Sequence, residues 1–204
     1  MARKENFLKS LCNLTYGIGN HCKLTEQELL ASGYYEDVVN VYRILGGVLS
    51  MPPIRVGKYD IDTDNFIIEL DEENHFNRYR LSTLNSPIYA NNPNIDVAQY
   101  KKFCKNYEDR CLTYGKYAKN DSTEKQFGYC ELDGNLGDSR SRWKQRAFYD
   151  FIKDITSIVK NVPIIRISIY EKYKGLTIEK LIDGEYRGLL IEYINMRLDG
   201  LKKF

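Results

Sequence analysis

The strongest constraint on the fold is a long amphipathic segment that runs directly into an apolar one. From about Ser139 to Lys160, apolar residues recur at helical spacing, which predicts a helix with one buried face. This apolar stripe consists of Trp143, Ala147, Phe148, Phe151, Ile152, Ile155, Ile158 and Val159. The run 162–170 that follows is almost continuously apolar, which predicts a buried, central strand. A helix joined to such a strand predicts an α/β or α+β domain, with helices flanking a small mixed β-sheet.

Further elements are predicted on either side of this unit. They are a helix over 25–45 with a break at Ser32-Gly33, a hairpin of strands 54–60 and 66–71, a helix near 96–113 and a helix over 186–201. Thr25 and Glu28 form a capping-box pattern at the start of the first of these helices. A length of 204 residues suits a single domain over 1–204. We expect its core in about 25–84 and 136–204, with a helical and loop insertion over about 85–135.

The predicted hairpin gathers acidic residues on one face. A turn at 62–65 would pair Ile61 with Phe66, and the two-residue period of a strand then separates an apolar face from a polar one. The polar face collects Lys58, Asp60, Glu69 and Asp71. Three carboxylates so placed repel one another unless a cation holds them, and Mg²⁺ prefers such ligands. The alternative is a solvated acidic strand edge on which a lysine pairs with a glutamate.

The residues that follow these acids suit phosphate chemistry. His75 is a candidate for proton transfer, and Arg78 and Arg80 carry guanidinium groups that match phosphate geometry. The alternative for the histidine is a purely structural role.

Four cations lie within seven residues at the start of the predicted 139–160 helix. They are Arg140, Arg142, Lys144 and Arg146. Positive charge is disfavoured at a helix N-terminus, and a bound phosphate would relieve that cost. In this interpretation the nucleic-acid contacts are Arg78, Arg80, Arg140, Arg142 and Arg146. The alternative is a solvated helix face.

The composition of the chain indicates its cellular compartment more than its chemical activity. The net charge is only +2, so a basic surface for nucleic acid would have to be local. The N-terminal sequence lacks an apolar signal region, and no run of about eighteen apolar residues occurs, so we expect a cytoplasmic protein without a membrane segment. The five cysteines lack CxxC spacing, which favours free thiols in a reducing compartment.

These residues resemble the PD-(D/E)XK nuclease superfamily, above all its very short patch repair endonuclease-like branch and small uncharacterised relatives of that branch. The matches are Asp60, the run 67–75, the segment 138–146 and the run 164–167. Together they lie within about residues 54–80 and 138–170. One departure is Asp71, because many members of the superfamily carry at that position a lysine that orients or activates water. Lys144 is a candidate for the missing cation.

The resemblance implies a restriction-endonuclease-like core that binds Mg²⁺ or Mn²⁺ and hydrolyses DNA. It implies that Asp60 and Asp71 ligate the metal and that Glu69 is a further ligand or positions water. It also implies that His75 transfers a proton or contacts phosphate.

Three hypotheses remain for the function. The first is a metal-dependent endonuclease that acts on DNA in repair, restriction or defence against foreign DNA, and a homodimer would suit it because duplex cleavage needs two cuts. The second is a catalytically degenerate nuclease-fold module that binds nucleic acid or a protein partner. The third is an unrelated α/β protein whose acidic hairpin is a coincidence. The sequence leaves open the substrate form, the choice between DNA and RNA, and the oligomeric state.

Overall fold

The computed structural model describes residues 2–90, 92, 95–114, 121–128 and 141–201, which form a mixed α+β fold. The helices are α1 (Ala2–Tyr16), α2 (Glu26–Ser32), α3 (Tyr35–Ile44), α4 (Arg78–Thr83), α5 (Val97–Asn106), α6 (Glu108–Tyr114), α7 (Asp121–Phe127), α8 (Ser141–Lys160), α9 (Ile178–Asp183) and α10 (Arg187–Leu201), with the 3-10 turns η1 (Glu73–His75) and η2 (Pro87–Tyr89). The strands are β1 (Ile61–Asp62), β2 (Ile67–Asp71), β3 (Ile164–Ser168), β4 (Lys172–Tyr173) and β5 (Leu176–Thr177). The predicted fold class, a small mixed sheet flanked by helices, is therefore confirmed.

The main sheet has the order β1-β2-β3, so β2 is its central strand. β1 pairs with β2 in antiparallel orientation, and β3 pairs with β2 in parallel orientation. The prediction that the 162–170 strand is central is wrong, since β3 lies at the edge of the described sheet. Every residue of β3 is nevertheless buried, because helices cover both faces of the strand pair. Burial rather than hydrogen-bonding position explains the apolar sequence.

The hairpin differs from the prediction in register and in length. Ile61 pairs with Ile68 rather than with Phe66, because Thr63 closes a tighter turn. Its backbone N–H and its hydroxyl donate to the Phe66 carbonyl oxygen at 3.0 and 2.6 Å. The predicted strand 54–60 is absent, since the Asp60 carboxylate accepts the Leu70 N–H at 2.9 Å in place of a backbone carbonyl. The shift is two residues, so the division into faces is unchanged.

The helices follow the sequence signals closely at α2, α3, α8 and α10. Thr25 and Glu28 form the capping box in both directions, and Gly33, with φ 81°, ends α2 in the left-handed conformation. A break therefore separates α2 from α3 as predicted. The helix predicted near 96–113 is divided into α5 and α6. α1, α4 and α9 and the β4–β5 hairpin were not predicted.

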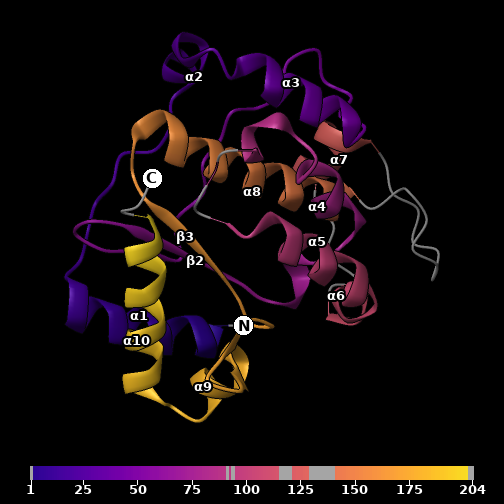
Figure 1. The fold of residues 1–204 in the computed structure, drawn as a ribbon. Helices are drawn as coiled ribbons and strands as arrows, with labels where there is room; N and C mark the ends of the chain where they lie inside the picture. The colour runs from indigo at the N-terminus through magenta and orange to yellow at the C-terminus, as the bar shows by residue number, and fades with distance from the viewer. Residues whose placement is uncertain (1, 91, 93–94, 115–120, 129–140, 202–204) are drawn as a thin grey trace.

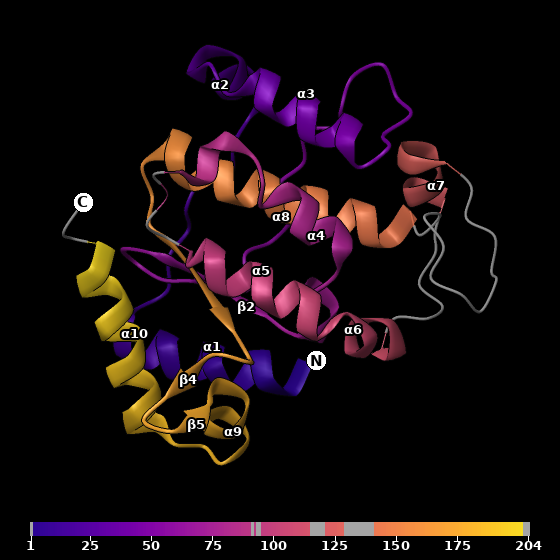
Figure 2. The ribbon, with the colours of Figure 1, turned by 45° about the vertical axis from the view of Figure 1, so that its right-hand side comes forward.

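The helices lie in layers around the sheet. α8 packs on one side of β2 and β3, whereas α1, α9 and α10 lie on the other side (Figure 1 and Figure 2). α2 and α3 lie beyond α8, on the side away from the sheet. Because Glu69 pairs with Arg166 across the parallel strands and contacts α8, the polar face of β2 is turned toward α8.

One apolar core joins the segments before and after the expected insertion. α5 contributes Tyr100, Phe103 and Cys104 to the same buried cluster that contains Phe148 and Ile155 of α8. The part of 85–135 that the structure describes therefore packs into the domain and not merely onto its surface. No helix among the described residues has the length and apolar character needed to cross a membrane.

Candidate metal centre

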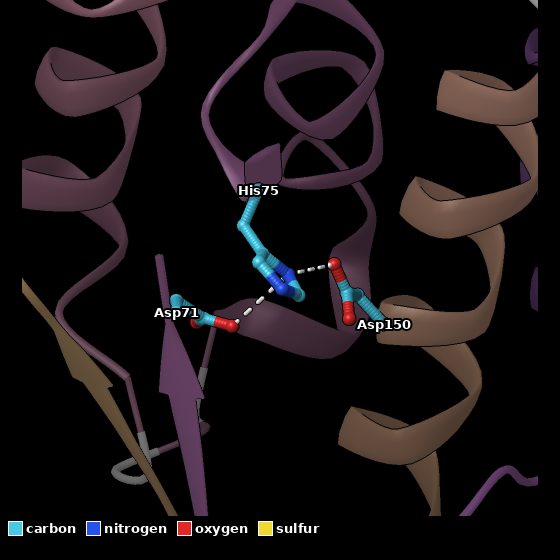
Figure 3. Close-up of side chains that lie close together, drawn as sticks. All are labelled: Asp71, His75 and Asp150. Carbon is cyan, nitrogen blue, oxygen red and sulfur yellow. Dashed lines mark hydrogen bonds and ion pairs between the residues drawn. The ribbon is translucent and has the colours of Figure 1, made fainter. Parts of the chain in front are cut away.

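Two aspartates and a histidine from different elements meet at the end of the central strand (Figure 3). Asp71 is the last residue of β2, His75 is the last residue of η1, and Asp150 lies midway along α8. His75 Nδ1 lies 3.2 Å from Asp71 Oδ1 and 2.8 Å from Asp150 Oδ2. One ligand atom from each residue lies within 4.8 Å of the other two, so these residues form a candidate metal site. The aspartate side chains are 1% and 6% exposed and the histidine 16%, so the site opens toward solvent at the histidine.

The local sequence fixes the position of His75. Its backbone N–H donates to the Glu72 carbonyl oxygen at 3.0 Å and closes the 3-10 turn. Asn77 then starts α4, since its side-chain oxygen accepts two backbone N–H groups of the first helical turn. Phe76, between these two residues, is fully buried in the core. A turn, an apolar anchor and a helix cap thus place the imidazole between the two aspartates.

A buried arginine on β3 links the acids of the site. Arg166 donates from Nη1 to Asp71 Oδ1 at 2.7 Å and from Nε to Asp154 Oδ1 at 2.5 Å. Its Nη2 lies 3.0 Å from the backbone oxygen and 3.5 Å from the carboxylate of Asp150. Asp154 also pairs with Arg80 at 2.7 Å. Three buried carboxylates thus face two buried guanidiniums, which leaves one negative charge in excess.

The charges of this network keep Asp150 and Asp154 ionised. Burial opposes ionisation of Asp150, but His75 and Arg166 hold its pKa well below the usual range. Burial likewise opposes ionisation of Asp154, and the two neighbouring arginines keep its pKa lowered. A positive charge between Asp71 and Asp150, either a proton on His75 or a metal ion, balances the excess.

The second ring nitrogen of His75 faces a basic part of α8. Arg146 Nη1 lies 3.3 Å from His75 Nε2. This contact assigns the Nε2 lone pair to Arg146 and a proton on Nδ1 to the carboxylates, when the ring is neutral. Arg142 lies one helical turn before Arg146 and donates to Gln145 Oε1 at 2.7 Å. Among the described residues, neither arginine forms an ion pair with a carboxylate.

A protein-family profile, described as a family of unknown function (DUF7255), matches residues 40–184. The chain belongs to this family. The DUF7255 match includes β1, β2, α8 and β3, and with them all three residues of the candidate metal site. A comparison with curated proteins and a comparison with solved structures each found no match.

Asp60 and Glu69, two of the predicted metal ligands, make contacts of their own beside the site. Glu69 is 1% exposed, and its Oε2 accepts a bond from Lys153 at 2.6 Å. Its other carboxylate oxygen has no hydrogen-bond partner among the residues that the structure describes, and burial raises the pKa of Glu69 to about 8. The Asp60 carboxylate binds the Leu70 N–H. The structure therefore groups Asp71 with His75 and Asp150, and neither Asp60 nor Glu69 belongs to that group.

The predicted cations are scattered. Arg80 is 1% exposed and paired with Asp154, so the prediction that it contacts phosphate is wrong. Arg78 pairs with Glu108 at the surface at 2.8 Å. Lys144 lies over the Tyr79 ring, with 5.7 Å from its Nζ to the ring centroid, and takes no part in the acidic cluster. Arg140 lies outside the described residues. Arg146 is the predicted cation that contacts the site, and Arg142 lies one helical turn before it.

Four residues of the site were not predicted to belong to it. They are Asp150, Lys153, Arg166 and Tyr100. A signal for Asp150 was present, because Arg142, Arg146, Asp150 and Asp154 recur every four residues on one face of α8. A charged stripe beside an apolar stripe on the same helix indicates a second, polar contact with the sheet.

Proposed function

We propose that this DUF7255 protein is a metal-dependent phosphodiesterase that cleaves nucleic acid, with Asp71, His75 and Asp150 as metal ligands. The observation that carries the proposal is the spacing around His75 Nδ1, which lies 3.2 and 2.8 Å from the two carboxylates. In an octahedral site with bonds of about 2.1 Å, neighbouring ligand atoms lie about 3.0 Å apart. His75 Nδ1 thus fits a corner of an octahedron that is adjacent to the corners of both carboxylate oxygens, once the Nδ1 proton gives way to the ion.

The donor set also favours one metal over another. Mg²⁺ prefers oxygen ligands, whereas Mn²⁺ accepts an imidazole together with carboxylates more readily. We therefore propose Mn²⁺ as the preferred ion. A bound metal would supply an activated water near pH 7 and would neutralise charge on the phosphoryl group.

The two arginines of α8 support a phosphate-containing substrate. Burial lowers the pKa of Arg142, and the positive charge of Arg146 lowers it further. Two neighbouring, half-buried guanidiniums repel each other, and a phosphate between them removes that cost. Because Arg146 contacts His75, a phosphate bound there lies beside the proposed metal. The PD-(D/E)XK resemblance of β2 and the residues after it makes DNA the first substrate to test, with roles in repair, restriction or defence.

A second candidate function is binding without catalysis. Each carboxylate oxygen of Asp71 and Asp150 already faces a donor, namely Arg166 and Tyr100 for the first residue and His75 and Arg166 for the second. Because these oxygens already have hydrogen-bond donors, the arrangement favours a nuclease-like core that does not catalyse cleavage. In that case Arg142 and Arg146 would bind nucleic acid or an acidic protein partner, and no bond would be cleaved.

The test compares the two histidines of the chain, each of which pairs with an aspartate. His21 Nδ1 lies 2.5 Å from Asp62 and provides a matched control outside the site. We expect the wild type to bind Mn²⁺ in calorimetry and to nick supercoiled DNA. His75→Gln should abolish binding and slow nicking by roughly 10²-fold or more, and His21→Gln should do neither.

The possible outcomes separate the two candidates. The proposed enzymatic function would be refuted if both variants bound metal and nicked DNA to the same extent. It would also be refuted if the wild type cleaved neither DNA nor RNA with Mn²⁺ or Mg²⁺. DNA binding that survives without metal and is lost in Arg146→Met would then support the binding module.

A further inference from the structure

α5, which lies in the segment expected to be an insertion, supplies a contact to the candidate metal centre. Tyr100 of α5 is 1% exposed, and its hydroxyl donates to Asp71 Oδ2 at 3.0 Å. Arg166 holds the other oxygen, Oδ1, at 2.7 Å. Each oxygen of Asp71 is therefore held by a different residue. This arrangement fixes the rotation of the carboxylate, so that Oδ1 faces His75.

The surroundings of Tyr100 fix its own position in turn. Its ring packs against Phe76 with a centroid distance of 5.6 Å and against Phe103 with one of 6.1 Å. Phe76 follows His75 directly in the sequence, so one aromatic cluster anchors both the histidine and the tyrosine that holds Asp71. Burial raises the pKa of Tyr100 well above its ordinary value. The 3.0 Å contact with the carboxylate oxygen makes the hydroxyl the donor of this bond.

We propose that Tyr100 is a positioning residue, which orients the Asp71 carboxylate for metal binding through a hydrogen bond to Oδ2. This inference rests on the proposed function. Groups that hydrogen-bond to a metal ligand orient it, and their loss typically weakens metal affinity by roughly 10- to 100-fold. The contact also gives α5 a role in the site, and it predicts that 85–135 cannot be deleted without loss of metal binding.

The chain offers a closely matched control. Tyr89 is also buried, at 6% exposure, and its hydroxyl lies 2.5 Å from Asp154 Oδ2. Asp154 belongs to the same charge network but lies outside the candidate metal group. Tyr100→Phe and Tyr89→Phe each remove one buried hydroxyl that donates to a buried aspartate. They differ in whether that aspartate is a proposed ligand.

The experiment measures Mn²⁺ affinity by calorimetry and the melting temperature for wild type and both variants. We expect both variants to melt a few degrees lower, because each loses a buried hydrogen bond to a charged group. Tyr100→Phe should bind Mn²⁺ roughly tenfold more weakly, while Tyr89→Phe should stay within about twofold of the wild type.

Failure of the positioning role and failure of the proposed metal site give different results. If the wild type binds Mn²⁺ and both variants bind it as tightly as the wild type does, the positioning role of Tyr100 is refuted while the metal site stands. If Tyr89→Phe weakens binding as much as Tyr100→Phe, the effect comes from the network as a whole, which also refutes the inference. If the wild type binds no Mn²⁺, the proposed metal function and the inference fall together.

Discussion

Arg166 is the residue whose replacement should damage the fold most, because three buried carboxylates depend on it. It is 1% exposed and pairs with Asp71, Asp150 and Asp154. Arg166→Met keeps much of the side-chain volume but removes the charge. The basic partners that the three acids keep would then be Arg80 and His75. Removing one partner of a buried ion pair costs about 3–5 kcal/mol, because the remaining charge stays buried without compensation.

That loss is large relative to the stability of a typical domain, which is about 5–15 kcal/mol. The assay is urea unfolding at pH 7, with the unfolding free energy extrapolated to water. Arg78→Met is the control, since Arg78 is likewise paired with a carboxylate, that of Glu108 through two bonds, but its side chain is 47% exposed. Surface pairs of this kind contribute about 0–1 kcal/mol.

The pH dependence provides a second test of the same reasoning. In Arg166→Met the buried acids lose their stabilising cation, so at least one of them binds a proton more readily in the folded state than in the unfolded state. Stability of the variant should therefore recover relative to the wild type as the pH falls from 7 to 5. The reasoning would be refuted if Arg166→Met cost no more than Arg78→Met at pH 7.

Two further predictions concern residues beside the site and far from it. Burial raises the pKa of Glu69 to about 8 from its ordinary value of 4.5, so the folded state holds a proton that the unfolded state releases. This contribution to the free energy of unfolding is complete below pH 4.5 and is lost as the pH rises through 8. At about 1.36 kcal/mol per pH unit, the wild type should lose a few kcal/mol of stability relative to Glu69→Gln between pH 5 and 9. Parallel pH profiles of the two proteins in urea unfolding would contradict this prediction. A Cβ atom at Gly19 would lie 1.9 Å from the Thr63 carbonyl oxygen, which is backbone and cannot move aside cheaply. Gly19→Ala should therefore cost about 1–3 kcal/mol or more in thermal unfolding, whereas Gly57→Ala, with open space around the added atom, should cost less than about 1 kcal/mol.

The sequence predicts the elements whose packing follows from their own pattern. The stripe of α8 and the capping box at Thr25 each specify a helix without knowledge of its neighbours. The predicted hairpin register is wrong because the actual register depends on a side-chain contact. The hydroxyl of Thr63 bonds the Phe66 carbonyl, and no periodicity argument includes such a contact. Similarly, β1 does not extend back to Asp60, because the Asp60 carboxylate accepts the Leu70 N–H that would bond a backbone carbonyl in a longer strand.

The site was half predictable for a similar reason. Asp71 and His75 lie four residues apart in the sequence, so their proximity follows from a short turn. Asp150 comes from a helix that packs across the sheet, and Arg166 comes from the neighbouring strand. A pattern within one segment cannot show which acid a distant helix will present. The opposite error occurred at Arg80, which resembles a phosphate-binding residue in sequence but pairs with a buried aspartate.

The charged face of α8 is the feature that unites the core with the proposed site. Along this face Asp150 and Asp154 lie deep and are matched by buried arginines, as the desolvation of charge requires. Arg142 and Arg146, nearer the start of the helix, are half-buried and have no carboxylate partner among the described residues. The helix dipole disfavours cations at that end. The buried ion pairs therefore account for the acids, whereas the proposed anion would neutralise the arginines, and His75 contacts members of both groups.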